Sequence, residues 1–293
     1  MPQETTRDKI FLDYTQEELD WQYDHSKRFP DTSLFQKERG DASLAAQKKV
    51  KGLLNIPYGN DKREVLDIFP AENTKAPVIV FMHGGAWTRG SKEGYSFPAA
   101  EFVPRGVTWV ATEFTNVPEG TLSNQVRQNR DAVAWVYNNA EAYGWDRDKI
   151  YIAGHSSGAH MCAMSLVTDW KQLYDLPRDL IKGAIAISGM YDLEAVYLSY
   201  RNTYLNLSQK DWRENSPIFH IPLVSDTPLL IGCAEHDTAE FHRQPEDFIK
   251  AWQSAGHSGE LIKLMDRHHF TGSMCFGEVE HPLFNKICEM IGV

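Results

Sequence analysis

The sequence contains no long hydrophobic run. Nowhere in its 293 residues do the roughly 18 consecutive apolar side chains of a membrane-spanning helix occur. Its start, MPQETTRDKIFLDYTQEELD, has no basic stretch followed by an apolar one, which is the pattern of a secretory signal. We therefore expect a cytoplasmic chain with no membrane partner.

Cysteines and clustered basic residues are also scarce. The four cysteines show no CxxC spacing, and in a chain of this length they are expected to be free thiols; they are Cys162, Cys233, Cys275 and Cys288. The formal net charge is −10, and no cluster of Lys and Arg is present that would neutralise phosphates. We therefore expect no nucleic-acid partner and a small-molecule substrate. The sequence leaves open whether the chain forms a homodimer.

Strand and helix patterns alternate through most of the chain. Residues 1–50 carry charged and aromatic residues at helical spacing and contain no strong strand. After them, apolar runs that are typical of strands buried on both faces alternate with helices, two of which are expected at 124–144 and 240–256. The expected strands are 63–69, 77–83, 107–114, 149–155, 182–189, 228–234 and 260–266.

This alternation predicts an α/β fold with a mostly parallel sheet flanked by helices. No repeat, low-complexity tract or linker divides the sequence, so we expect a single domain over 1–293 with a helical N-terminal segment at 1–50. Residues 197–224 have few strand signals and are a candidate cap insertion near the functional site.

The pentapeptide GHSSG at 154–158 directly follows Lys149 to Ala153 of an expected strand and precedes a helix that begins near Ala159. This is the G-x-S-x-G turn in its strand-turn-helix setting. The flanking glycines lack the Cβ atoms that would clash with the strand and helix, and only the central side chain projects from the turn. Ser156 is therefore the predicted nucleophile, and the backbone N–H of Ser157 is a predicted oxyanion donor. The alternative is a tight structural turn without chemistry.

A serine nucleophile needs a general base and a carboxylate that fixes the tautomer of that base. In the G-x-S-x-G hydrolases both follow the serine in the chain, the acid first. The last expected strand leads into His268 and His269, which the residue pattern alone does not rank. Asp237 follows an earlier strand, with room for one helix and one strand before the histidines, and is the predicted acid. The rival acids are Glu235, Glu240 and Asp192.

The stretch HGGAW at 83–87 follows another expected strand and matches the loop that completes an oxyanion hole. Small residues let the backbone approach a developing negative charge, so Gly85 and Ala86 are predicted donors. His83 precedes the loop and is expected to be a structural hydrogen-bonding residue. Trp87 is assigned to substrate binding, with ordinary packing as the alternative.

A zinc site is the alternative use of the histidine-rich segments. Its candidate ligands would be His236, Asp237, His242 and the pair 268–269. Because no HExxH or comparable spacing is present, we expect no metal and no cofactor.

Several stretches together resemble the kynurenine formamidases (arylformamidases) and their bacterial relatives, within the esterase group that includes hormone-sensitive-lipase-like enzymes. They are HGGAW, GHSSGAH, HDTAEFHRQ and HHF, and the likeness extends over nearly the whole chain through YDHSKRFPD, LDIFP, RDAVAWVYNNAEAYGWD and KGAIAISGMYDLEAV. The resemblance implies an α/β-hydrolase that converts N-formyl-L-kynurenine to L-kynurenine and formate in tryptophan catabolism, without metal or cofactor. By position, it implies Ser156 as nucleophile, Asp237 as acid and His269 as base. Relatives often carry alanine where Ser157 stands.

Two other functions are compatible with parts of this pattern. A promiscuous carboxylesterase for short acyl esters would use the same machinery. A noncatalytic module on a hydrolase scaffold would be expected to lose the nucleophile or the base, whereas every required residue type is present here in order. Aromatic residues that are candidates for the wall of an aryl pocket are Tyr23, Phe29, Tyr197, Tyr200, Tyr204 and Trp212.

Overall fold

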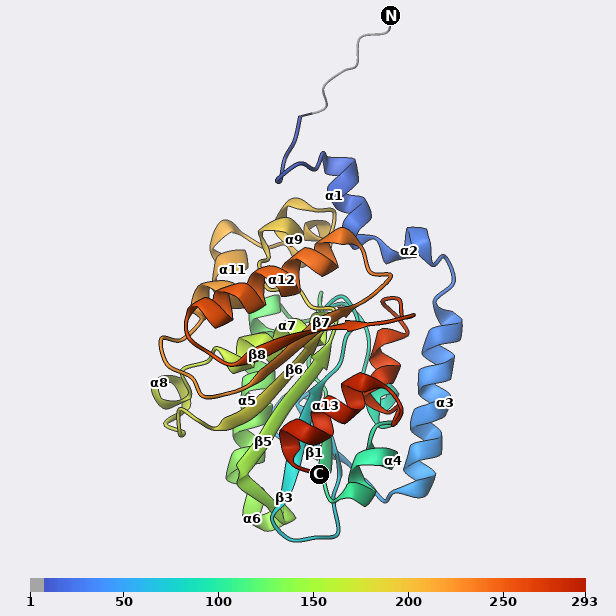
Figure 1. Cartoon of the computed structure of the whole chain (residues 1–293), viewed down its shortest axis with the longest axis vertical. Helices are drawn as coiled ribbons and strands as arrows, with labels where there is room; N and C mark the ends of the chain where they lie inside the picture. Colours follow the sequence, from blue (N-terminus) through green and yellow to red (C-terminus); the bar gives the residue numbers. More distant parts are fainter. Residues whose placement is uncertain (1–7) are drawn as a thin grey trace, which may run out of the picture.

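A single eight-stranded sheet forms the centre of the molecule (Figure 1), seen in a computed structural model that describes residues 8–293. The strand order is β1-β2-β4-β3-β5-β6-β7-β8. β1 and β2 run antiparallel to their neighbours, and all pairs from β4 to β8 are parallel. The strands are β1 (Leu53–Pro57), β2 (Val65–Phe69), β3 (Ala76–Met82), β4 (Thr108–Thr112), β5 (Trp145–His155), β6 (Ile181–Ile187), β7 (Leu229–Ala234) and β8 (Gly259–Leu264).

Both faces of the central strands are buried. In β3, Val78 and Val80 pack into one hydrophobic core, whereas Ile79 and Phe81 pack into a second core on the other face. A parallel strand covered on both sides needs apolar residues at every position, which explains the unbroken apolar runs of the sequence. The predicted α/β architecture with a mostly parallel sheet is confirmed.

Helices cover both faces of the sheet (Figure 1). α5, α7 and α12 supply residues to one core, and α4 and α13 supply residues to the other. The helices are α1 (Gln16–Tyr23), α2 (His25–Arg28), α3 (Ser33–Lys49), α4 (Ala99–Phe102), α5 (Leu122–Asn138), α6 (Ala140–Tyr143), α7 (Ser157–Leu166), α8 (Trp170–Tyr174), α9 (Glu194–Leu198), α10 (Asn202–Leu205), α11 (Gln209–Glu214), α12 (Ala239–Ser254) and α13 (Pro282–Ile291), with 3₁₀ turns η1 (Lys92–Tyr95), η2 (Val103–Arg105), η3 (Pro217–His220) and η4 (Gly272–Phe276). Within residues 8–293, no helix combines the length and apolarity needed to cross a membrane.

Two elements differ from the predictions. β1 is missing from the predicted strands because it is an edge strand whose side chains are mostly exposed, so it has no continuous apolar run. The helix predicted at 124–144 is divided into α5 and α6 at Asn139, which caps the first of them. Each of the predicted strands overlaps one of β2 to β8.

The helical N-terminal segment and the segment 197–224 meet above the carboxyl ends of the strands. α1, α2 and α3 lie in the segment predicted as 1–50, of which the first seven residues are outside the described residues. Between β6 and β7, residues 197–224 contain short helices and no strand. The backbone N–H of Tyr200 donates to the Asp20 carboxylate at 2.6 Å, and Arg201 donates to the carbonyl oxygen of Tyr23 at 2.7 Å. Hydrogen bonds therefore join the two segments.

Candidate active site

Ser156 occupies a strained turn between β5 and α7. Its φ of 57° and ψ of −127° lie in a region that residues with a Cβ rarely adopt, so the surrounding structure has to enforce it. Two glycines make the close packing feasible. A Cβ at Gly154 would lie 2.2 Å from the carbonyl oxygen of Gly158, and a Cβ at Gly158 would lie 2.0 Å from that of Met82. The G-x-S-x-G spacing is thus a packing requirement of this turn.

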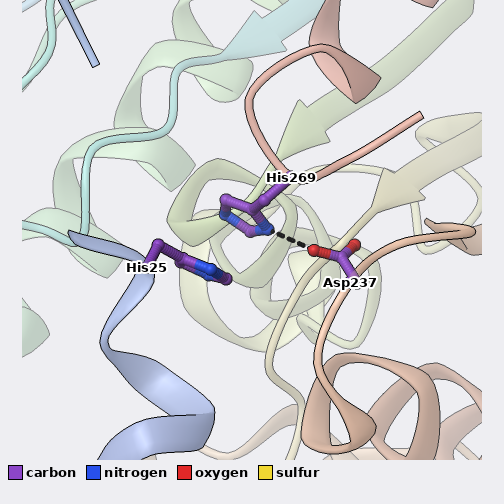
Figure 2. Close-up of side chains that lie close together, drawn as sticks. All are labelled: His25, Asp237 and His269. Atoms are coloured by element: carbon purple, nitrogen blue, oxygen red, sulfur yellow. Dashed lines mark hydrogen bonds and ion pairs between the residues drawn. The ribbon is translucent and has the colours of Figure 1, made fainter. Parts of the chain in front are cut away.

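Three side chains that are distant in sequence form one hydrogen-bond chain. Ser156 Oγ lies 2.9 Å from Nε2 of His269, and Nδ1 of His269 lies 2.8 Å from Oδ1 of Asp237. Figure 2 shows the second of these bonds. Because an ionised carboxylate only accepts, Nδ1 carries the proton and Nε2 is left to accept from the serine hydroxyl. All three residues are buried.

The Asp237 carboxylate is held by further donors. Its Oδ2 accepts from the Ser188 hydroxyl at 2.7 Å and from the backbone N–H of Ala234 at 3.0 Å. Burial alone would raise the pKa of Asp237, but the charge and hydrogen bond of His269 and these two donors together lower it. The acid therefore stays ionised and keeps His269 in the tautomer described above. Sequence reasoning did not identify Ser188, whose only signal is its place directly after β6.

The other residues considered as catalytic acid or base form hydrogen bonds elsewhere. Glu240 is fully buried and pairs with Arg243, and Glu235 accepts from the backbone of Asp266. Asp192 accepts from the backbone N–H of Glu194. His268 is half-buried, and its Nδ1 accepts from the backbone N–H of Phe270. Of the candidate acids and bases, Asp237 and His269 are the pair that meets Ser156.

The loop after β3 presents backbone donors beside Ser156. Gly85 and Ala86 line the same pocket as the serine, with φ values of 142° and 52°. Neither backbone N–H has a hydrogen-bond partner within residues 8–293. A Cβ at Gly85 would lie 1.8 Å from the carbonyl oxygen of Arg89, so glycine is required there. Ser157 is the first residue of α7, where a helix leaves its N–H unpaired and its dipole is positive.

His83 and Trp87, at the two ends of the HGGAW stretch, are both buried. His83 is buried, and its Nδ1 and Nε2 lie 3.0 Å from the carbonyl oxygen of Gly84 and 3.3 Å from Glu113, as expected of a structural residue. For Trp87 the structure fits the packing alternative. Its side chain is 1% exposed, lies outside the lining of the pocket and donates to His160 at 3.3 Å.

A pocket of about 560 Å³ opens on Ser156 and His269. Of the aromatic residues considered from the sequence, Tyr23, Tyr200 and Tyr204 line this pocket. The remaining aromatic candidates lie outside its lining; they are Phe29, Tyr197 and Trp212. The N-terminal helices and the segment 197–224 therefore both contribute to the wall around the serine.

His25 is a pocket residue that sequence reasoning missed. Its ring stacks on that of His269, with centroids 3.9 Å apart and an interplanar angle of 19°, and Figure 2 shows the two side by side. Burial, followed by the neighbouring charge of His269, lowers the pKa of His25 well below its ordinary value. His25 is therefore neutral and covers one face of the base. His25 belongs to the stretch YDHSKRFPD that carries part of the family resemblance, but its role appears only in its contact with His269, more than two hundred residues away.

His25 also belongs to a group of potential metal ligands with Asp237 and His269, whose ligand atoms lie within 4.8 Å of one another. In this arrangement both ring nitrogens of His269 are committed to the hydrogen-bond chain. The other histidines considered as zinc ligands lie elsewhere. His236 is exposed, and Nδ1 of His242 lies 3.1 Å from Cys233 Sγ.

A mostly parallel sheet, with a serine on the turn after a central strand and with an acid and a histidine after later strands, defines the α/β-hydrolases. Solved structures agree with this fold. A Silicibacter protein assigned as a thioesterase superposes with a TM-score of 0.80 at 22% identity, covering 92% of this chain and 98% of that one. An esterase from Pyrobaculum calidifontis superposes with a TM-score of 0.69 at 19% identity, covering 89% of this chain and 93% of that one. The chain is a hydrolase of this class.

Sequence relatives identify the family of hydrolases to which the chain belongs. The BD-FAE family matches residues 66–251, a range that includes Ser156 and Asp237. A kynurenine formamidase from Salmo salar is 36% identical over 82% of this chain and 82% of its own length. Another kynurenine formamidase, from Danio rerio, is 29% identical over 95% of this chain and 97% of its own length. The chain belongs to the BD-FAE family and to the kynurenine formamidases, as the resemblance had implied.

Proposed function

We propose that the chain hydrolyses aryl formamides, and N-formyl-L-kynurenine in particular, to the aryl amine and formate. The observation that carries this proposal is the hydrogen-bond chain from Ser156 through His269 to Asp237, which opens on a pocket walled by tyrosines. The kynurenine formamidases of two fishes, which match most of the chain, support the choice of substrate.

In the first half of the reaction, Nε2 of His269 takes the proton of the Ser156 hydroxyl while Oγ forms a bond to the formyl carbon. The carbonyl oxygen becomes an oxyanion, which the N–H groups of Gly85, Ala86 and Ser157 would bind. When the tetrahedral intermediate collapses, the C–N bond breaks and His269 gives its proton to the departing aryl amine. A formyl ester of Ser156 remains.

In the second half, water replaces the amine. His269 takes one proton from water as its oxygen attacks the formyl carbon, and the second intermediate releases formate when the bond to Oγ breaks. The proton on His269 returns to Ser156. The Asp237 carboxylate stabilises the imidazolium in both halves, and its lowered pKa keeps it ionised throughout.

The experiment that tests this proposal is replacement of the nucleophile. Ser156→Ala should reduce turnover of N-formyl-L-kynurenine by about 10⁶-fold, because no acyl-enzyme can form. Ser258→Ala is the matched control, since Ser258 also follows Gly-His but is exposed. A fluorophosphonate probe should label the unaltered chain and the Ser258 variant alone. Full hydrolysis by Ser156→Ala would rule out the proposed mechanism.

A carboxylesterase acting on short acyl esters is the second candidate. It is supported by an isoprenylcysteine alpha-carbonyl methylesterase from Arabidopsis thaliana, 27% identical over 73% of this chain and 56% of that protein. A formamidase needs room only for a formyl group at the acyl carbon, so p-nitrophenyl butyrate should be a poor substrate beside N-formyl-L-kynurenine. Equal or higher kcat/KM on butyrate would favour the esterase.

The proposed location is the cytoplasm. The four cysteines are buried and unpaired, which is compatible with a reducing compartment.

A further inference from the structure

The pocket above Ser156 is positively charged, although the whole chain has a formal net charge of −10. Its charged lining residues are Arg39, Arg89, Arg201 and Asp24. Asp24 lies 3.9 Å from Lys27, whereas none of the three arginines forms an ion pair in the described part of the chain. Three unpaired cations in the wall of one pocket favour an anionic ligand.

Arg201 is the most constrained of these arginines. It is 3% exposed, and its Nε and Nη2 donate to the carbonyl oxygen of Tyr23 at 3.2 and 2.7 Å. Its guanidinium carbon also lies 5.5 Å from the ring centre of Tyr23 and 5.8 Å from that of Trp87. These contacts fix the plane of the guanidinium and leave one amino group for another partner.

That remaining group, Nη1 of Arg201, is buried and has no hydrogen-bond partner among residues 8–293. A buried guanidinium without an anion is costly, because it has lost its hydration and gained no counter-charge. A carboxylate oxygen is a charge-matched acceptor for the one amino group that remains. The buried, unpartnered Nη1 of Arg201 therefore favours an anionic ligand such as a carboxylate.

Arg201 lies on the side of the pocket that His25 covers. Tyr23, whose carbonyl oxygen binds Arg201, precedes His25 by two residues, and His25 stacks on His269. The charge of Arg201 is also among the causes that lower the pKa of His25, after burial and His269. Arg201 forms no hydrogen bond with Ser156, His269 or Asp237, so it is free to bind a part of the substrate that does not react.

We propose that Arg201 binds a carboxylate that the substrate carries outside its formamide group. The preferred substrates are then aryl formamides that carry a carboxylate besides the reacting group. Arg39 and Arg89 add to the positive field that attracts the substrate. This inference rests on the proposed formamidase activity and deepens it by naming the feature of the substrate that is recognised.

The test compares two substrates that share the reacting group. N-formyl-L-kynurenine carries the carboxylate, and 2-formamidoacetophenone has the same aryl formamide without it. Arg201→Met, which keeps an apolar stem in the buried site, should lower kcat/KM for the first substrate by about 10- to 100-fold, mainly through KM. The same variant should change kcat/KM for the second substrate by less than about threefold. Arg201→Lys should give a kcat/KM for N-formyl-L-kynurenine between those of the unaltered chain and Arg201→Met, since lysine keeps the charge but loses the planar guanidinium.

Arg213→Met is the matched control, because Arg213 lies in the same segment, forms no ion pair among the described residues and does not line the pocket. It should leave both substrates unaffected. Equal losses on both substrates in Arg201→Met would overturn the inference, as would an unaltered chain that turns over both formamides equally well. Failure to hydrolyse either formamide would instead overturn the proposed function.

A measurement on the unaltered chain covers the case in which Arg201→Met does not fold. The product L-kynurenine should inhibit hydrolysis of 2-formamidoacetophenone at a concentration about tenfold or more below that of 2-aminoacetophenone, which lacks the carboxylate. Equal inhibition by the two amines would contradict a role for Arg201 in carboxylate binding.

Discussion

Three donors converge on the carboxylate of Asp237: His269 through Nδ1, the Ser188 hydroxyl and the backbone N–H of Ala234. Each of them favours the charged form, and together they outweigh the burial that would raise the pKa of this acid. Only one of the two carboxylate oxygens faces the base. The other is occupied by Ser188 and Ala234, so the orientation of the acid is fixed from the side opposite to His269.

Removing the Ser188 hydroxyl tests this arrangement. Ser188→Ala should lower kcat by about tenfold, while Asp237→Asn should lower it by about 10⁴-fold, because only the second change alters the tautomer of His269. The loss of a donor also removes one of the groups that lower the pKa of Asp237. Ser165→Ala is the control, a buried serine bonded to its own helix. An unchanged rate in Ser188→Ala would contradict this account.

At the scale of elements, the junction of β5 and α7 depends on backbone contacts that leave no space for a side chain. Gly158 lies in the first turn of α7, where its Cα faces the carbonyl oxygen of Met82 at the end of β3. Because the obstructing atom belongs to the backbone of a central strand, rotation of a side chain cannot relieve the overlap. The position of Ser156 is therefore coupled to the approach of α7 to the sheet.

Gly158→Ala should destabilise the fold by about 3 kcal/mol, because the new methyl group would lie 2.0 Å from the Met82 oxygen unless the helix shifts. Gly40→Ala is the matched substitution, since Gly40 lies in the interior of α3 and an added Cβ meets nothing within 4 Å. It should instead stabilise the chain by about 0.5–1 kcal/mol. Urea denaturation of both variants measures the two changes, and equal stabilities would refute the packing argument.

The sequence predicted the elements whose signals are local. One such signal is the apolar run of β5. Others are the glycines around Ser156 and the small residues at 84–86, where the backbone leaves no room for a larger side chain. The acid and the base could be placed only because chain order in hydrolases restricts them. The roles of Ser188 and His25 could not be predicted, and the two alternatives for Trp87 could not be ranked, because each depends on packing between segments that only the folded chain brings together.

Across the whole molecule, several histidines are buried in their neutral form. Burial, with smaller effects of neighbouring charges, lowers the pKa of His155 to about 3 and that of His160 to about 4, and that of His25 lies well below its ordinary value. His160 accepts from Trp87 through Nδ1 and donates to the carbonyl oxygen of Asn215 through Nε2. A proton on Nδ1 would therefore remove a hydrogen bond in the core.

Stability should fall as the pH decreases from about 6.5 to about 4, because unfolded histidines bind protons in this range and the buried ones do not. Each such histidine contributes up to about 1.4 kcal/mol per pH unit to the free energy of unfolding. Urea denaturation at several pH values checks this dependence. His160→Gln should reduce the slope by the contribution of one proton, whereas the exposed His236→Gln should not. A free energy of unfolding that is constant over this range would disprove the prediction.

The stacking of His25 on His269 makes the first helices part of the catalytic apparatus. A shortened protein that began at β1 would retain the nucleophile, acid and base in their order, but it would expose one side of the imidazole to water. It would also lose the carbonyl oxygen that anchors the Arg201 guanidinium. Leu19 and Tyr23 of α1 also belong to one hydrophobic core, and Val50 belongs to the other, so the same truncation would weaken the packing of the sheet as well as open the chamber around Ser156.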